Sequence, residues 1–151
     1  MKIIVKRAEF ADLNEIAILF DAYRVFYKQQ SDMEIALKFI KERFNNSESV
    51  IFYAKDENGK YVGFTQLYPS FSSVSVQRTW VLNDLFVLVE MRSLGVGKKL
   101  LNKAKEFALV TKVKGIALET AASNTKAQKL YESIGYTRNS EFSYFLNLNQ
   151  G

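Results

Sequence analysis

A glycine pair flanked by basic side chains is the first feature of this sequence that could do chemistry. The stretch RSLGVGKKLL contains Gly95 and Gly97. Arg92 precedes the pair and Lys98 follows it, at a point where an apolar run gives way to a helical pattern. The first backbone amides of a helix lack intrahelical partners and attract anions, and glycine lets a phosphate approach the backbone closely. The stretch is either a phosphate cradle or a plain tight turn into a helix.

Spacing excludes two common nucleotide-binding motifs at this position. The dinucleotide fingerprint G-x-G-x-x-G needs a third glycine, and Leu100 stands there. A P-loop needs Ser or Thr after its Gly-Lys pair, where Lys99 stands, and a glycine five residues before Gly97, which is missing. Neither a nucleotide hydrolase nor a dinucleotide enzyme therefore fits.

Asn124 and Tyr131 form a second group of candidate residues, in the stretch SNTKAQKLYESIGY. Asparagine is a favoured residue at a helix start. Tyr131 follows seven residues later, on the helix face of Ala127 and Leu130. Its phenol could donate a proton to a leaving group. It could equally be a core aromatic residue with a hydrogen-bonded hydroxyl.

The pair Asn83–Asp84 interrupts an otherwise apolar run, TWVLNDLFVLVE. A carboxylate that loses its water there has a raised pKa, which suits a general base near neutral pH. Asp84 could instead hold a cationic amine, or accept hydrogen bonds from neighbouring backbone. Glu119, at the end of GIALET, is a second candidate base. The chain has no histidine and no cysteine, so acid–base chemistry falls to Asp, Glu, Tyr, Lys or water.

Apolar periodicity predicts the elements that must position these residues. Strands are expected over residues 2–8, 49–55, 61–68, 79–90, 115–120 and 142–148, and helices over 12–27, 31–44, 97–108 and 124–135. The order β-α-α-β-β-β-α-β-α-β describes an α/β fold, a mixed sheet with helices on both faces. Residues 80–119 should form a parallel, right-handed crossover.

Length and charge describe a single domain and leave its partner open. The chain has 151 residues and a net charge of +5, which indicates either a solvated basic surface or an anionic ligand, such as nucleic acid or a phosphorylated cofactor. It lacks a basic–aromatic recognition motif, so nucleic acid is disfavoured. It also lacks an apolar run of the ~20 residues that span a membrane. The first ten residues lack a signal-peptide pattern, and we expect a cytoplasmic protein without a membrane partner.

The two motifs R-x-x-G-x-G and N-x-x-A-x-x-L-Y-x-x-x-G-Y together resemble the GNAT superfamily of acetyl-CoA-dependent N-acetyltransferases. The resemblance covers residues 83–136, and the expected order of elements matches that fold, with its mostly antiparallel central sheet. The stretch LYPSFSSVSVQRTWVLNDLFV resembles more narrowly the branch of histone, polyamine and diamine acetyltransferases. The resemblance implies acetyl-CoA as the cofactor, one N-acetyltransferase domain over residues 1–151, and a homodimer.

The resemblance also implies how the cofactor is bound. The backbone of Leu85, Phe86 and Val87 would pair with the pantetheine arm. Arg92 and the amides of the following loop would hold the pyrophosphate, and the loop residues are Ser93, Leu94, Gly95, Val96, Gly97 and Lys98. Asn124 and Ala127 would flank the cofactor further along. This chain departs from the family pattern at Val89, where proline is frequent, and at Ser93, where glycine is frequent.

For the chemistry, the resemblance implies that Tyr131 protonates the departing thiolate. In related diamine enzymes a glutamate stands at the position of Asn83, so the base is open here. Asp84 acting through a water is our candidate, and Tyr27 and Asn83 are candidate substrate contacts. An aromatic face such as that of Tyr27 can hold an ammonium group. The expected reaction is direct acetyl transfer to a primary amine of a small molecule. A protein-lysine acetyltransferase and a silent acyl-CoA sensor stay open as alternatives.

Overall fold

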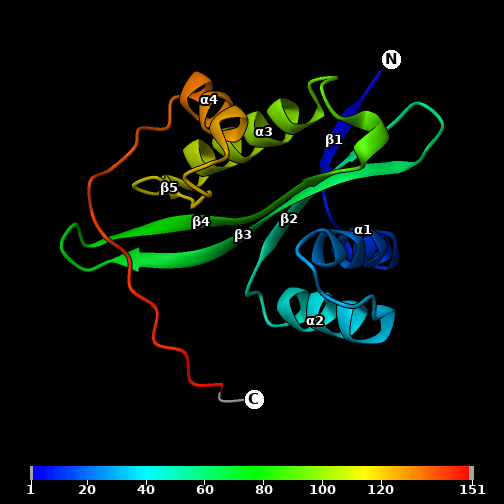
Figure 1. Ribbon diagram of the computed structural model, residues 1–151, viewed down its shortest axis with the longest axis horizontal. Helices are drawn as coiled ribbons and strands as arrows, with labels where there is room; N and C mark the ends of the chain where they lie inside the picture. Colours follow the sequence, from blue (N-terminus) through cyan, green and yellow to red (C-terminus); the bar gives the residue numbers. More distant parts are fainter. Residues whose placement is uncertain (1, 150–151) are drawn as a thin grey trace. The chain divides into compact units, whose positions relative to one another are not determined.

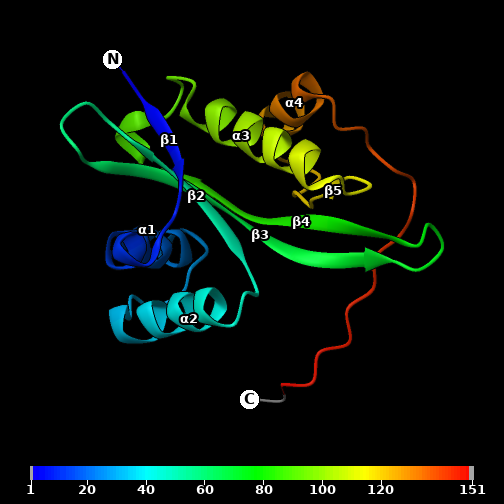
Figure 2. The same ribbon diagram turned by 180° about the vertical axis from the view of Figure 1, so that it is seen from behind.

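The computed structural model describes residues 2–149, which fall into two compact units, residues 2–119 and 120–149. The first unit contains the sheet and helices α1 to α3. The second contains helix α4 (Thr125–Ile134) and the chain that follows it. Figure 1 labels these elements, and Figure 2 shows the same ribbon from behind.

A five-stranded sheet forms the centre of the first unit, with the strands in their sequence order. The strands are β1 (Ile4–Arg7), β2 (Val50–Lys55), β3 (Tyr61–Ser72), β4 (Gln77–Val87) and β5 (Ile116–Ala117). Neighbours from β1 to β4 pair antiparallel, and β4 pairs with β5 in parallel. The expected parallel crossover between β4 and β5 is therefore confirmed, with helix α3 in its connection.

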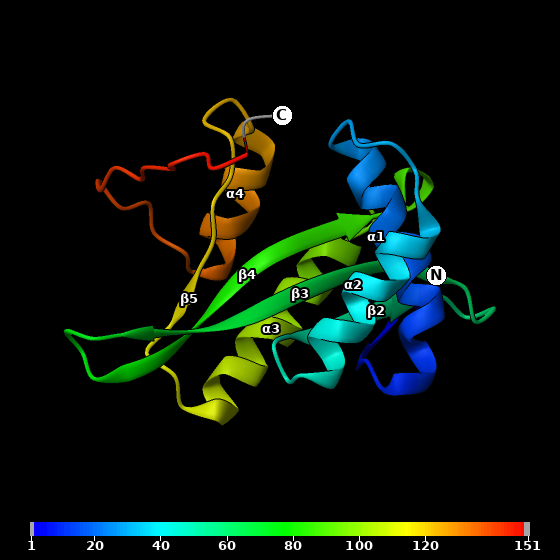
Figure 3. The ribbon, with the colours of Figure 1, turned by 90° about the horizontal axis from the view of Figure 1, so that it is seen from below.

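Helices cover both faces of this sheet, as Figures 1 and 3 show. Helices α1 (Leu13–Phe26) and α2 (Met33–Asn45) pack on one face, and α3 (Val96–Thr111) packs on the other. Short 3-10 turns precede α1 (Phe10–Asp12) and α3 (Val89–Met91). On the α1 face the core contains Ile16, Phe20 and Phe64, all buried. On the α3 face, Leu100 and Leu101 are fully buried.

The turn between β2 and β3 has the residues and hydrogen bonds of the expected hairpin. Gly59 has a φ of 84°, which L-residues rarely adopt, and the stretch DENGK forms the turn. Asp56 accepts hydrogen bonds from the backbone N–H of Asn58 and of Lys60, both at 2.9 Å. The turn thus fixes the register of β2 against β3.

Two strand predictions differ from the structure. Residues 142–148 do not form a strand, and the predicted strand over 115–120 is reduced to β5, Ile116–Ala117. A strand needs a neighbour for its backbone groups as well as an apolar pattern, and within residues 2–149 neither segment has one beyond the short pairing of β5 with β4. The mixed α/β fold itself is confirmed.

Candidate active site

The loop before α3 has the backbone geometry of an anion site. Ser93 and Gly95 adopt left-handed conformations, with φ of 64° and 82°. Gly95 is the residue before the first turn of α3, and a Cβ placed on it would meet no atom within 4 Å. Helix hydrogen bonding begins where the N–H of Lys99 donates to the carbonyl of Gly95 at 3.1 Å. The amides of Val96, Gly97 and Lys98 therefore lack intrahelical acceptors and can bind an anion.

Strand β4 offers a free edge beside this loop. Its last pairing with β5 joins Val81 to Ala117. In the described part of the chain no strand continues beyond that point on this edge. The N–H of Leu88 donates to the carbonyl of Val62 in β3 at 2.9 Å. Since backbone groups alternate between the two neighbours of a strand, Leu85 and Val87 direct theirs to the free edge, and Phe86 directs its own to β3. Leu85 and Val87 thus have backbone groups free for the predicted pairing with pantetheine, and the cofactor contacts of Leu85, Phe86 and Val87 stay predictions.

Arg92 folds back toward β4 and α1. Its Nε donates to the carbonyl of Val87 at 2.9 Å. Its guanidinium lies over the rings of Phe26, at 5.0 Å, and Phe86, at 5.7 Å. Such stacking fixes the guanidinium next to the free edge of β4. Lys98, in the first turn of α3, is exposed.

A β-bulge at Asn83 interrupts the ladder between β3 and β4. Asp84 stands opposite Gln66, but Leu82 stands opposite Leu67, so Asn83 is the extra residue of β4. Bulges redirect the side chains around them and frequently lie near active sites. The apolar run TWVLNDLFVLVE shows no sign of this irregularity apart from its two polar residues.

The bulge decides which face of the sheet receives Asp84. Trp80 packs on Phe107 of α3, with ring centroids 5.4 Å apart, whereas Phe86 packs on Tyr23 of α1, at 6.1 Å. In a regular strand, residues six positions apart would share a face. Because the bulge reverses the alternation, Asp84 lies with Phe86 on the side of α1 and α2 rather than on the side of α3.

Asp84 and four polar residues around its carboxylate form a group that we name the Asp84 cluster: Tyr23, Gln66, Tyr68, Asn83 and Asp84. The Nε2 of Gln66 donates to Oδ2 of Asp84 at 2.5 Å and to the Tyr68 hydroxyl at 3.2 Å. The Nδ2 of Asn83 donates to Oδ1 of Asp84 at 2.8 Å. The Tyr23 hydroxyl donates to the carbonyl of Asn83 at 3.4 Å. Asp84 and Gln66 are fully buried, and Asn83 is the exposed member.

Burial controls the protonation of this cluster. It raises the pKa of Asp84 above the usual carboxyl value, and the hydrogen bonds from Gln66 and Asn83 offset this only in part. Burial and the charge of Asp84 likewise raise the pKa values of the Tyr23 and Tyr68 phenols. Both phenols therefore stay protonated at neutral pH. A carboxylate with a raised pKa, held among neutral donors, is suited to accept a proton.

Gln66 is the cluster residue that sequence reasoning missed. Its Oε1 is buried and has no hydrogen-bond partner among the described residues. An unmet buried acceptor costs about 1–3 kcal/mol, which a ligand N–H could recover. A signal was present, since YVGFTQLY places one polar residue deep in an apolar strand, as LNDLF does in the next strand. Only the pairing of the two strands shows that these polar residues meet.

Tyr27 lies at the end of α1 and is 60% exposed. Its ring packs edge-on against Tyr23, with centroids 5.0 Å apart, so Tyr27 contacts a member of the Asp84 cluster. This placement is compatible with the predicted substrate contact. Glu119, the second candidate base, is an exposed residue at the end of the first unit, outside the Asp84 cluster.

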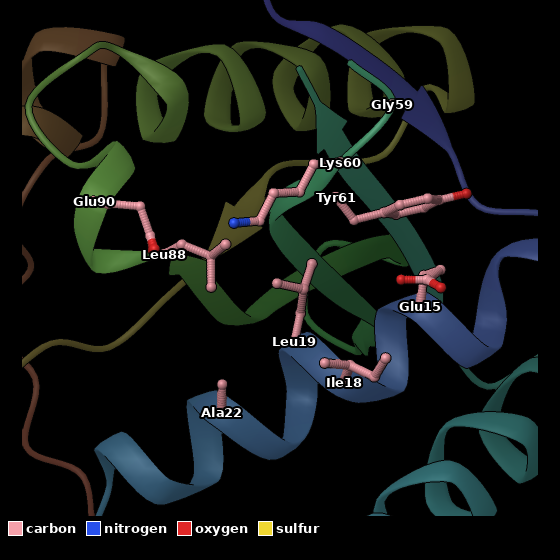
Figure 4. Close-up of a pocket in the computed structure, with 9 residues that line it drawn as sticks. All are labelled: Glu15, Ile18, Leu19, Ala22, Gly59, Lys60, Tyr61, Leu88 and Glu90. Carbon is pink, nitrogen blue, oxygen red and sulfur yellow. The ribbon is translucent and has the colours of Figure 1, made fainter. Parts of the chain in front are cut away.

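A pocket of about 490 Å³ lies elsewhere on the first unit, between α1, the β2–β3 turn and the chain after β4. Figure 4 shows the Lys60 ammonium and the Glu15 and Glu90 carboxylates around an apolar floor. Its lining residues are Glu15, Ile18, Leu19, Ala22, Gly59, Lys60, Tyr61, Leu88 and Glu90. No member of the Asp84 cluster lines this pocket, so it is separate from the candidate chemistry.

In the second unit, Asn124 caps α4 as the sequence predicted. Its side chain accepts a hydrogen bond from the N–H of Ala127 at 3.1 Å. Tyr131 is half-buried and packs edge-on against Tyr136, with ring centroids 6.0 Å apart. Gly135 ends the helix with a φ of 118°. The roles of Asn124, Ala127 and Tyr131 toward a cofactor stay predictions.

A mixed sheet with helices on both faces, and a glycine turn at the start of α3 beside a free edge of β4, is the arrangement expected for the GNAT class of transferases. The model of the acetyltransferase (GNAT) family matches residues 13–136. An uncharacterized N-acetyltransferase of Bacillus subtilis, YhfO, is 46% identical over 93% of this chain and 94% of its own. The chain therefore belongs to the acetyltransferase (GNAT) family, and the expected enzyme class, an acetyl-CoA-dependent N-acetyltransferase, is confirmed at the level of the family.

Solved structures agree with this assignment. The crystal structure of a probable acetyltransferase is 41% identical, covers 100% of both chains and superposes with a TM-score of 0.90. The aminoglycoside N-acetyltransferase AAC(6')-Iy, in complex with CoA, is 17% identical and has a TM-score of 0.80 over 98% of this chain and 96% of its own. At that identity the second likeness shows the fold alone. The narrower resemblance to the histone and polyamine branch finds no support in these comparisons.

Among the described residues no helix combines the length and the apolar character needed to cross a bilayer.

Proposed function

We propose that this protein transfers the acetyl group of acetyl-CoA directly to a primary amine of a small molecule, with Asp84 as the proton acceptor. The observation that carries this proposal is the buried Asp84 carboxylate, held on the α1 side of β4 by Gln66 and Asn83. Acetyl-CoA supplies an activated acetyl group as a thioester. The residues of this chain would bind the cofactor, orient the amine and move its proton.

The anion site and the free strand edge fit the cofactor. The open space above Gly95 and the amides of Val96 to Lys98 suit a pyrophosphate. The backbone groups of Leu85 and Val87 suit the amides of a pantetheine arm, in the manner of an added strand. We infer that Arg92 and Lys98 add positive charge near the phosphates, and that Asn124 and Ala127 contact the cofactor from α4.

The amine must lose a proton before it attacks. A lysine-like amine has a pKa near 10.4 and is mostly protonated at neutral pH. Asp84 would hold the ammonium and take its proton, directly or through a water at the exposed Asn83. The unmet Oε1 of Gln66 gives the amine a second acceptor, and Tyr27 would bind the rest of the substrate. A new C–N bond forms as the C–S bond breaks, and Tyr131 would give its proton to the departing sulfur.

Small amines are favoured over a protein substrate because the carboxylate is deeply buried and Asn83 is its only exposed neighbour within the Asp84 cluster. The aminoglycoside enzyme among the structural neighbours is a further example of this fold acting on a small amine. We also propose that the protein works as a homodimer. A cytoplasmic location stays a prediction of the sequence.

The test is release of free thiol from acetyl-CoA in the presence of polyamines, amino acids, aminoglycosides and a lysine peptide. Release with a small amine, and little with the peptide, is the expected result. Thiol release with the lysine peptide alone would contradict the proposal and indicate a protein-lysine acetyltransferase instead. Binding of acetyl-CoA without release for any amine would show a sensor.

A further inference from the structure

The pocket beside the β2–β3 turn has the size and the make-up of a second ligand site. Its volume of about 490 Å³ lies within the range of roughly 300–1,000 Å³ that small-molecule sites occupy. It is lined by the first unit alone and by no member of the Asp84 cluster. Three charged side chains stand around its apolar floor in Figure 4: Glu15, Lys60 and Glu90.

One face of α1 supplies the floor of the pocket and one end of its rim. Glu15, Leu19 and Ala22 are four and three residues apart, so they share one side of the helix. Leu19 is part of the buried core of the first unit, and Ala22 and Leu88 pack against that core. Glu15 is exposed on the same helix face. The helix therefore places a carboxylate beside an apolar surface.

The β2–β3 turn fixes the backbone of Lys60 at the rim. The N–H of Lys60 donates to the Asp56 carboxylate, and the N–H of Asp56 donates to the carbonyl of Lys60, both at 2.9 Å. The Lys60 side chain itself is exposed. Because both backbone groups of Lys60 are bonded, its ammonium extends over the floor from an anchored position (Figure 4).

The 3-10 turn Val89–Met91 fixes Glu90 in the same way. Before it, the N–H of Leu88 donates to the carbonyl of Val62 at 2.9 Å. After it, Met91 is buried and donates its N–H to the carbonyl of Leu88, also at 2.9 Å. The exposed Glu90 carboxylate therefore starts from a fixed backbone too. A rim with anchored positions loses little backbone freedom when a ligand binds.

The three rim charges are available to a ligand. Within residues 2–149 none of the three side chains forms a salt bridge or accepts or donates a side-chain hydrogen bond. Figure 4 shows the Lys60 ammonium and the Glu90 carboxylate toward one end of the pocket. The Glu15 carboxylate lies toward the other end, with Leu19 between the two ends. The pocket thus offers a mixed pair of charges, an apolar stretch and a second negative charge, in that order.

We propose that this pocket binds a dibasic α-amino acid, such as lysine or ornithine. The α-carboxylate would pair with the Lys60 ammonium, and the α-ammonium with the Glu90 carboxylate. The methylene chain would lie over Leu19 and Leu88. The terminal ammonium would reach Glu15 at the far end. The inference goes beyond the proposed function and uses none of the residues that carry it.

The order of the charges selects this class of ligand. The rim has two carboxylates and one ammonium, and a dibasic amino acid has two ammonium groups and one carboxylate. A polyamine would bring a positive charge against Lys60, and a dicarboxylic acid would bring a negative charge against Glu15. An amino acid with an apolar side chain would match one end of the pocket only. Like charges brought together in this way oppose binding.

Calorimetric titration of the full chain with L-lysine, without acetyl-CoA, tests the far end of the pocket. We expect one saturable site, and weaker binding of 2-aminohexanoic acid, the same ligand without its terminal ammonium. The difference in Kd should be about 1.5- to 5-fold, as for an exposed ion pair. Glu15→Gln should abolish the difference. Glu34→Gln, at an exposed position of α2 outside the pocket, should preserve it. A difference that survives Glu15→Gln would overturn the proposed pose.

Charge reversal at Lys60 tests the other end. Lys60→Glu places a carboxylate where the α-carboxylate of the ligand would lie, so the Kd for L-lysine should rise at least about tenfold. The control Lys38→Glu makes the same change at an exposed position of α2 and should bind as wild type does. Both positions are exposed, and circular dichroism checks that both variants are folded. Equal affinity in the two variants would contradict the site.

L-lysine also offers amines to the Asp84 cluster, and one comparison separates the two sites. Binding in the pocket predicts that Asp84→Asn keeps the Kd of wild type while Lys60→Glu loses affinity. The opposite result, loss in Asp84→Asn and full binding in Lys60→Glu, would overturn the pocket and support the amine site of the proposed function. Tighter binding of spermidine than of L-lysine, or no binding of L-lysine at millimolar concentration, would also refute the proposal.

Discussion

The side-chain amide of Gln66 in β3 donates to the buried carboxylate of Asp84 in β4, 2.5 Å away across the ladder. The contact exists because a bulge at Asn83 turns Asp84 to the α1 side of the sheet. The contact links Asp84, the proposed proton acceptor, to Gln66, which belongs to no recognised motif. The free acceptor of Gln66, its Oε1, lies in the same cluster.

Replacing Gln66 by Leu should shift the pH dependence of catalysis. The Gln66 hydrogen bond lowers the pKa of Asp84, so its loss raises that pKa further. A hydrogen bond to a charged group is worth about 1.5–3 kcal/mol, which corresponds to about one to two pH units. The acidic limb of kcat/KM should therefore move upward by about that amount. The matched control is Thr65→Val, because buried Thr65 bonds only the backbone carbonyl of Asp84. An unmoved limb in Gln66→Leu would show that Gln66 does not position the base.

Replacing Asp84 by Asn should change how stability depends on pH. The folded-state pKa of Asp84 is raised above its unfolded value, so its contribution to stability is complete below about pH 3.9 and is lost as the pH rises through the folded pKa. Wild type should therefore lose stability relative to the variant as the pH rises above about 4 and approaches the folded pKa of Asp84. The variant also leaves one of two donors unmet, a constant cost of about 1–3 kcal/mol. Urea unfolding at several pH values measures both, and parallel curves would contradict burial of the charge.

Replacing Gly95 by Ala should weaken cofactor binding. Gly95 has a φ of 82° and faces open space, where the added methyl would meet an approaching phosphate. We expect the Kd for acetyl-CoA to rise about tenfold, which equals about 1.4 kcal/mol. Gly59→Ala is the matched control, because Gly59 has a φ of 84° and equally open surroundings, away from the loop. Both variants should lose about 1–2 kcal/mol of stability from backbone strain. Equal acetyl-CoA affinity in the two variants would exclude the phosphate cradle.

Replacing Tyr131 by Phe should slow turnover and leave acetyl-CoA affinity nearly unchanged. Loss of a general acid costs about 10²–10⁴-fold in rate. Tyr136→Phe is the control, since its hydroxyl is buried without a hydrogen-bond partner among the described residues, and burial raises its pKa to about 12. That control should keep its activity and fold at least as stably as wild type. Equal turnover in the two variants would remove Tyr131 from the acid role.

Local sequence patterns predict the helices, turns and caps of this molecule. Other features depend on how its strands pair, which local patterns do not show. The helices, the β2–β3 turn and the cap at Asn124 depend on residues close in sequence, so periodicity and capping rules found them. The bulge at Asn83 depends on how β4 meets β3, and so does the contact between Gln66 and Asp84. For the same reason the alternation over residues 142–148 predicts a strand that the structure does not form, since alternation is a local property and a neighbouring strand is not.

The most direct test is the rate of thiol release with the best amine, measured for wild type and for Asp84→Asn at saturating acetyl-CoA. A proton acceptor contributes about 10²–10⁴-fold, so the variant should turn over at least about 100-fold more slowly. Raising the pH should recover part of its kcat/KM, because a larger fraction of the amine is then already neutral. A variant that matches wild type at neutral pH would contradict Asp84 as the base of this acetyltransferase.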